Sequence, residues 1–268
     1  MNALKTLILL GIFTTLPACD VEDDDAPTGE GTWRFTVFGE DFIEQGIPAD
    51  AFIDGWSVNF DHFYIVVSGI SGDGVSIGEA KVFDLAQDSG GAGHLFAEAM
   101  APAQTHEFVG YTVAPAASAT GANVDDTVVQ ALVTGGFSVQ VEGSATKGDV
   151  TKNFGWRFTT ATTYGPCEIS QPLATGGTIT SQFTIHADHL FYDDLDSSEP
   201  NVAFDLIATA DANNDGTLTE AELAAVDITG ETRYQVGSRT EIGTLWAFIE
   251  AQTATLGHID GEGHCEVE

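Results

Sequence analysis

Apolar and polar residues alternate through most of the first two thirds of the chain, which is typical of β-strands with one buried face. Trp33, Phe35 and Val37, for example, alternate with Arg34 and Thr36. Segments of the same kind are residues 56–66, 80–85, 108–113, 127–133, 137–141, 153–160 and 178–186. Glycine-rich breaks separate them. Short strands without intervening helices predict a mainly β fold, an antiparallel β-sandwich, and both jelly-roll and immunoglobulin-like connectivity fit.

Beyond the last predicted strand, the spacing of apolar residues changes to that of helices. Residues 201–210 and 219–226 predict two short helices around a polar loop. Residues 240–256 predict a longer helix, with a capping box of Ser238 and Glu241 at its start. We expect this helical segment to pack on the sandwich rather than to fold alone. The predicted organisation is a signal peptide (1–18), an acidic tether (19–31), a β-sandwich (32–192) and a C-terminal helical segment (193–268).

The N-terminus has the features of an export signal. Lys5 precedes the apolar residues 7–13, a run too short to span a bilayer. The sequence from Leu16 to Cys19 resembles the lipobox of bacterial lipoproteins. That resemblance implies cleavage before Cys19 and a lipid on its thiol, which would anchor the protein to a membrane, facing the periplasm or the cell surface. The alternative is an ordinary cleaved signal peptide with Cys19 as an incidental residue.

Export also changes how the other two cysteines are interpreted. Apart from Cys19, the chain holds only Cys167 and Cys265. An even pair in an oxidising compartment predicts one disulfide. This bridge would close a loop of about 100 residues, which the chain-entropy treatment values at up to about 4.7 kcal/mol. It would clamp the C-terminal segment onto the rest of the molecule.

The chain is strongly acidic, with 8 Lys and Arg residues against 41 Asp and Glu residues and a formal net charge of −33. Nucleic acids and anionic membrane surfaces are therefore poor partners, because like charges repel. An acidic surface is stable where cations screen it, as in a salty or calcium-rich exterior. The simpler explanation is that the charge keeps an exported protein soluble.

Residues 211–222 contain the most specific motif of the chain. They resemble the twelve-residue calcium loop of the EF-hand family, in which oxygen ligands recur at fixed positions, a glycine turns the chain at the sixth position and a glutamate closes the shell. Gly216 and the apolar Leu218 match two of the non-ligand positions. The ligands that the resemblance implies for Ca²⁺ are Asp211, Asn213, Asp215, Thr217, Thr219 and Glu222.

A single loop of this kind favours a structural role for calcium. EF-hands usually occur in facing pairs, and the chain contains no second loop with this pattern. A switch that opens a target groove is therefore not expected. The alternative is a solvated acidic turn, which is common in so acidic a chain.

A second candidate metal site follows the last predicted strand. His186, Asp188 and His189 lie within four residues, and neutral imidazoles suit zinc, copper or iron. His62 lies on the predicted buried face of its strand, where an unpaired imidazole is costly, so we expect it to have a partner. The simpler alternative is that these side chains are hydrogen-bonded structural residues.

The β region also has a fainter resemblance. An aromatic strand around His62, a strand at residues 82–85, an aromatic strand at residues 154–158 and a cysteine soon after it are similar to the exported metal-binding proteins found beside methanobactin clusters. The similarity covers roughly residues 32–192. It implies a β-sandwich that handles copper or haem at the cell envelope, and it assigns no copper ligand in this chain.

No pattern of the chain predicts an enzyme. It contains no Gly-x-Ser-x-Gly elbow, no phosphate-binding glycine loop and no His-Glu-x-x-His sequence. His94, His106, His258 and His264 are scattered among glycine-rich or terminal segments. The sequence therefore predicts an exported calcium-binding lipoprotein. The alternatives are a periplasmic or surface carrier of copper, iron or haem, and a surface adhesion or interaction module.

Overall fold

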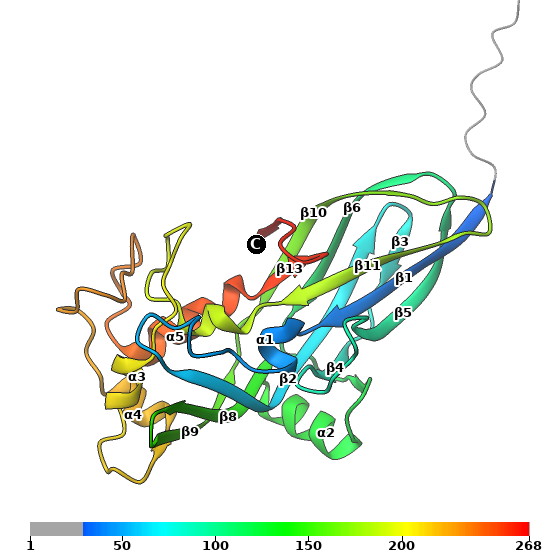
Figure 1. Cartoon of the computed structure of the whole chain (residues 1–268). Coiled ribbons are helices and arrows are strands. Elements are labelled where there is room, and N and C mark those ends of the chain that lie inside the picture. The colour runs from blue at the N-terminus through cyan, green and yellow to red at the C-terminus, as the bar shows by residue number, and fades with distance from the viewer. Residues whose placement is uncertain (1–28, 268) are drawn as a thin grey trace, which may run out of the picture.

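The computed structural model describes residues 29–267, and two β-sheets share one core in it, with most of the C-terminal helices gathered at one end (Figure 1). The predicted signal peptide, Cys19 and most of the tether lie outside the described residues. The strands are β1 (Glu30–Phe38), β2 (Ser57–Gly72), β3 (Val75–Ile77), β4 (Lys81–Asp84), β5 (His94–Pro102), β6 (Thr105–Val113), β7 (Thr120–Gly121), β8 (Val139–Lys147), β9 (Val150–Phe158), β10 (Thr162–Pro172), β11 (Thr178–Ile185), β12 (Thr217–Leu218), β13 (Gly257–Ile259) and β14 (Cys265–Val267). The helices are α1 (Glu40–Glu44), α2 (Asp126–Gly135), α3 (Asp205–Thr209), α4 (Glu220–Ala224) and α5 (Leu245–Gln252), with 3₁₀ turns η1 (Ala187–Phe191) and η2 (Thr253–Thr255).

The fold is mainly β and sandwich-like, as the sequence predicts. One sheet has the order β13-β11-β1-β5, and the other runs β12-β9-β8-β2-β6-β10-β14, with β3 and β4 pairing with β2 and β7 pairing with β4. Most neighbours are antiparallel, but β1 with β11, β9 with β12 and β4 with β7 pair in parallel. The strands of each parallel pair are far apart in the chain, so no hairpin fixes their direction.

The core lies between the sheets and follows the predicted alternation. Trp33, Phe35 and Val37 of β1 are fully buried. The indole N–H of Trp33 donates to the Ser181 hydroxyl at 3.0 Å. Phe35 stacks on Phe183 of β11 with ring centroids 6.1 Å apart. The first predicted strand and its predicted buried face are therefore confirmed.

Strand β2 carries a bulge that exchanges its two faces. Its register with β8 shifts between Phe60 and His62. An extra residue in one strand reverses which side chains point inward. Val58 is buried in the main core before the shift, and Phe63 is buried there after it. The expectation that His62 lies on the buried face is wrong, because its side chain is 44% exposed.

Residues 127–133 form helix α2 instead of the predicted strand. Val129 and Leu132 are buried on one side of this helix and share a small second core with Tyr64 on β2. Gly136, at φ 67°, ends the helix in the left-handed conformation. The β-branched valines suggested a strand, but the three-residue spacing of the buried positions is helical.

Two long strands, β5 and β10, were not predicted. Both have buried and exposed residues in imperfect alternation, which makes their period weak in the sequence. β10 pairs with β6 through two register shifts. These irregularities hide the strand because a bulge breaks the two-residue period.

The C-terminal helices are shorter than predicted. Residues 201–210 and 219–226 each contain one helix of five residues, α3 and α4. Helix α5 begins only at Leu245, where the Thr244 hydroxyl accepts from the Ala247 N–H, so the predicted cap at Ser238 is wrong. Among residues 29–267, no helix is both long and apolar enough to cross a membrane.

The predicted disulfide is present. Cys167 in β10 and Cys265 in β14 are joined by a disulfide across 98 positions of sequence. The bridge holds the last strand of the chain against the larger sheet. It therefore encloses the whole C-terminal helical segment within one covalent loop.

Candidate metal sites

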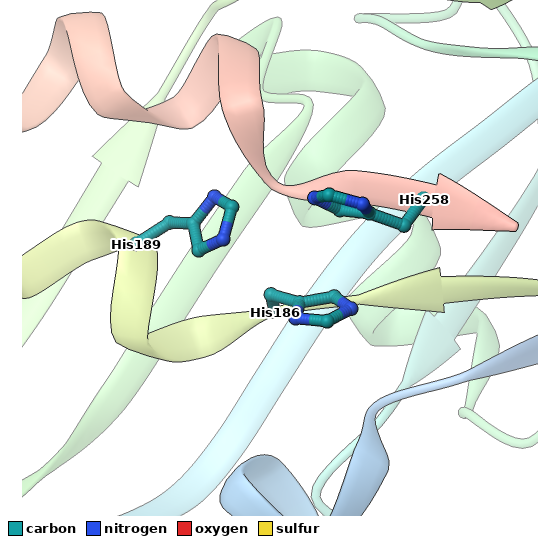
Figure 2. Close-up of side chains that lie close together, drawn as sticks. All are labelled: His186, His189 and His258. Carbon is teal, nitrogen blue, oxygen red and sulfur yellow. The ribbon is translucent and has the colours of Figure 1, made fainter. Parts of the chain in front are cut away.

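Three histidines meet at the end of the smaller sheet. His186 follows β11, His189 lies in η1 and His258 lies in β13 (Figure 2). β11 and β13 pair antiparallel, with Ile185 opposite Gly257, and the His186 N–H donates to the Leu256 carbonyl at 2.9 Å. The turn of η1 then brings the His189 ring back toward the same place. The pairing of two distant strands therefore builds the cluster.

The three rings are close enough to share one ion. Ring centroids are 4.4 Å apart for His186 and His258, and 5.4 Å apart for each of the other two pairs. One nitrogen from each ring lies within 4.8 Å of the others. His186 is 6% exposed and His189 is 9% exposed. Buried polar side chains this close together need partners.

Two ring nitrogens of the cluster have no hydrogen-bond partner among residues 29–267. Nδ1 of His189 lies 3.0 Å from the Thr255 hydroxyl. Nε2 of His186 and Nδ1 of His258 are buried and lack any hydrogen-bond partner in the part of the chain that the structure describes. A buried polar atom without a partner costs free energy, which a bound ligand would recover.

Burial disfavours the charged form of two of the three histidines. Burial, followed by the neighbouring imidazoles of His186 and His258, lowers the pKa of His189 to about 3. Burial and the charge of His186 also lower the pKa of His258. Neutral imidazole is the form that binds a metal ion. The nitrogen lone pairs are therefore available at neutral pH.

Two carboxylates lie on the other side of His186. Oε1 of Glu40 is 3.6 Å from Nε2 of His186, and Oε1 of Glu262 is 3.9 Å from its Nδ1. These three side chains also bring ligand atoms within 4.8 Å of one another. Burial is the main cause that raises the pKa of Glu40, whose backbone is left-handed at φ 54°. A cleft of about 410 Å³, lined by these residues with Asp41 and Asp188, opens beside them.

The predicted ligands Asp188 and His62 are not part of the histidine cluster. Asp188 accepts a hydrogen bond from the Tyr192 hydroxyl at 2.9 Å. His62 has the partner that we expected, since its Nδ1 lies 2.7 Å from Oδ2 of the buried Asp84. Its ring stacks on Tyr64, 4.9 Å away, on the outer face of β2. These contacts match the structural alternative for both side chains.

His258 is the residue that sequence reasoning missed. It belongs to a three-residue strand that follows a helix, and no spacing rule connects it to residues 186 and 189. Pairing of residue 258 with Thr184 becomes visible only when β11 and β13 are placed side by side. No signal in a single sequence would have identified it.

The predicted calcium loop, residues 211–222, turns sharply at Gly216. Gly216 adopts φ 82°, a conformation that favours glycine. The two carboxylate oxygens of Asp211 accept the N–H groups of Asp215 and Gly216 at 3.1 and 3.0 Å. The Thr217 N–H donates to Asp215 at 2.8 Å. The loop is thus wrapped around its first aspartate.

The loop is docked on the sandwich through its short strand. Leu218 in β12 is fully buried and lies beside Phe154 of β9 in a parallel pair. Its carbonyl accepts the indole N–H of Trp156 at 2.9 Å. The edge of the larger sheet therefore supports the loop, as a second loop does in paired EF-hands.

Other contacts in the loop compete with an ion. The Lys152 ammonium donates to Oδ2 of Asp211 at 2.5 Å, and this hydrogen bond is the main cause that lowers the pKa of Asp211. The Glu222 carboxylate caps helix α4 by accepting the N–H and hydroxyl of Thr219 at 3.0 and 2.8 Å. Within residues 29–267, the three loop carboxylates do not form a group with ligand atoms inside 4.8 Å. A calcium ion would have to draw them together.

Comparison of the chain with protein-family models, with curated proteins and with solved structures found no match in any of the three. The resemblances to EF-hands, to lipoproteins and to methanobactin-associated proteins therefore rest on the residues that carry them.

Proposed function

We propose that the protein is an exported metal-binding protein, not an enzyme, and that its main site holds one transition metal ion on His186, His189 and His258. The observation that carries this proposal is the convergence of three imidazoles, two of whose buried nitrogens lack partners among residues 29–267. Imidazole donors suit zinc, copper, nickel and iron rather than calcium or magnesium. Three protein ligands leave the fourth position of a tetrahedral metal ion open.

The surroundings of the cluster fit a carrier of a single ion. One nitrogen from each of the three rings lies within 4.8 Å of the others, whereas a haem takes one or two axial ligands on opposite faces. The carboxylate of Glu262 lies 3.9 Å from Nδ1 of His186 and would orient that ring while its Nε2 binds the ion. The cleft beside them offers a way for an ion to enter and leave. The faint resemblance to methanobactin-associated proteins favours copper as the cargo.

Metal analysis of the purified protein tests this proposal. We expect one equivalent of a transition metal after exposure to Cu(I) or Zn(II), and its loss in His189→Ala. His62→Ala is the matched control, because that imidazole lies on the outer face of β2, and it should keep the metal. Equal metal content in wild type and His189→Ala would reject the site.

We also propose a structural calcium ion at the loop of residues 211–222. The supporting observation is the left-handed Gly216 together with the docking of Leu218 on β9. At a calcium concentration of about 100 times the dissociation constant, the ion would add about 2.7 kcal/mol to the free energy of unfolding. A thermal melt with calcium and then with chelator measures this, and an unchanged midpoint would leave only an acidic turn.

The proposal also covers the localisation of the protein. We expect a lipid on Cys19 that anchors the protein outside the cytoplasm, consistent with a disulfide between Cys167 and Cys265. Metabolic labelling with a radioactive fatty acid should mark the wild type and not Cys19→Ala. Label on both chains, or on neither, would contradict the anchor.

A further inference from the structure

A polar cleft lies at the end of the molecule that carries α3, away from the histidine cluster and independent of the metal sites proposed above. It has a volume of about 550 Å³ and is lined by residues 53–54, by α3 and by residues 231–234. Its walls include the carboxylates of Asp54 and Asp205, the Tyr234 side chain, and the apolar Ile53 and Leu206. Three separate stretches of chain therefore meet around one space.

Two polar atoms in this wall have no partner. Oδ2 of Asp54 accepts the N–H groups of Phe204 and Asp205, each at 2.7 Å, and so caps α3. Oδ1 of the same carboxylate is buried and accepts nothing. The hydroxyl of Tyr234, a side chain only 4% exposed, is also buried without a partner. Such atoms are rare in folded proteins and call for a ligand or a specific reason.

The backbone holds Tyr234 in an uncommon conformation. Its φ is 59°, in the left-handed region that aromatic residues rarely adopt. The ring packs edge-on against Phe248 with centroids 5.3 Å apart, which fixes its direction. Burial, followed by the charges of Asp54 and Asp193, raises the pKa of Tyr234, so the hydroxyl keeps its proton. Backbone strain of this kind often occurs at binding sites.

We propose that this cleft binds the primary ammonium group of a small organic ligand, with Asp54 and Tyr234 as its acceptors. An ammonium supplies three N–H donors and a positive charge. The lining carries the carboxylates of Asp54 and Glu231 and the guanidinium of Arg233, while the third carboxylate, Asp205, is paired with Lys147 at 2.7 Å. Ile53, which is 48% exposed, and Leu206 offer an apolar wall for the carbon chain of the ligand.

A metal ion fits this cleft less well. Within residues 29–267, Asp54 belongs to neither of the two groups whose three ligand atoms lie within 4.8 Å. A metal would therefore have too few protein ligands, whereas an ammonium needs only hydrogen-bond acceptors. The same ammonium chemistry occurs in alkylamines and in free α-amino acids. Arg233, which forms no ion pair among the described residues, would favour the amino acid through its carboxylate.

Isothermal titration of the purified mature protein with n-butylamine, norleucine and N-acetylnorleucine tests the proposal. Binding of n-butylamine or norleucine at millimolar concentration, without binding of N-acetylnorleucine, supports it. Tighter binding of norleucine than of n-butylamine would identify the amino acid as the class of ligand. Absence of binding by both amines, or equal binding of the acetylated compound, overturns the proposal.

Two variants connect the binding to the cleft. Asp54→Asn keeps an oxygen to cap α3 but loses the charge, and it should weaken binding by about tenfold or more. Tyr234→Phe should weaken binding while leaving the melting midpoint unchanged or higher, because it removes an unpaired hydroxyl. Asp149→Asn, an exposed carboxylate in the β8–β9 turn, is the control and should bind as wild type does. Unchanged affinity in both cleft variants would refute the assignment.

Discussion

The calcium loop is one continuous stretch of twelve residues, whereas the histidine cluster takes its three rings from β11, η1 and β13. The loop satisfies its own backbone, since Asp211 and Asp215 accept N–H groups within the loop. The histidine cluster leaves Nε2 of His186 and Nδ1 of His258 without partners. A site formed by neighbouring residues can satisfy its polar groups with hydrogen bonds of its own. A site formed by packing of distant segments can leave polar atoms that only a bound ligand would satisfy.

The two sites also differ in how they handle charge. In the loop, the Lys152 ammonium pairs with Asp211, so a protein cation already balances part of the negative charge. In the cluster, burial lowers the pKa of His189 and His258, which favours their uncharged forms. Hydrogen bonds and an ion pair within the chain therefore hold the loop, whereas an ion at the cluster would remove an existing cost. The experiments below separate these two behaviours.

The largest expected effect is on transition-metal binding when one imidazole is removed. His258→Ala should weaken Cu(I) or Zn(II) binding by more than about hundredfold, because even indirect partners of a metal contribute 10–100-fold. Competition titration with a chromophoric chelator measures this. His264→Ala, an exposed histidine in the same terminal segment, should leave the affinity unchanged. A calcium-dependent melting shift that survives in His258→Ala would show that the two sites act separately.

Acid should weaken the cluster before it affects the loop. The pKa of His189 is about 3 in the folded chain against 6.5 for the free group, so the unfolded chain binds more protons between these values. Stability therefore falls as the pH drops from 6.5 towards 3, by at most about 1.4 kcal/mol per pH unit for this group. Above pH 6.5 this contribution is constant. Urea melts of wild type and His189→Ala across this range should converge at low pH, and parallel curves would contradict the shift.

Removing the last loop ligand should abolish the calcium effect alone. Glu222→Gln keeps an oxygen that can cap α4, but it offers calcium no charge. We expect the calcium-dependent part of the stability, about 2.7 kcal/mol at 100 times the dissociation constant, to disappear. Thermal melts with calcium and with chelator measure it, and Glu199→Gln, an exposed residue outside the loop, is the control. Transition-metal binding should not change in either variant.

The smallest expected effect comes from the lysine beside the loop. Lys152→Met removes the cation that donates to Asp211, so the calcium-free protein should become less stable and calcium should bind about tenfold more tightly. Calcium titrations followed by the melting midpoint measure both changes. Lys147→Met is a matched control, because that lysine pairs with the exposed Asp205 instead. Weaker calcium binding in Lys152→Met would mean that the lysine positions the loop rather than competes with the ion.

Patterns with a short range in the chain were predicted well. The alternation of Trp33, Phe35 and Val37 identified the buried face of β1. The pairing of Cys167 with Cys265 followed from counting. The strand face depends on residues that are neighbours in the chain, and the disulfide depends on a choice among only three cysteines. Successive side chains of a strand point to opposite faces, so the alternation in the sequence already predicts which residues are buried.

Features that depend on distant partners were missed or misassigned. The bulge at His62 exchanged the faces of β2, because β8 pairs with one residue fewer across that point. Valines in residues 127–133 formed helix α2, because Tyr64 and its neighbours offered a surface for one helical face. Local propensity is too weak to resist such packing, which contributes more free energy than the preference of a few residues for one conformation.

Local patterns in the chain were therefore enough to predict the mainly β fold and the disulfide. Packing of distant segments brings His258 to His186 and His189, and makes Asp54 and Tyr234 line the same cleft. The difference comes from the range of the interactions. Backbone geometry fixes neighbours within a few residues, while burial of apolar surface brings together strands and loops from anywhere in the chain, along with the polar side chains that they carry.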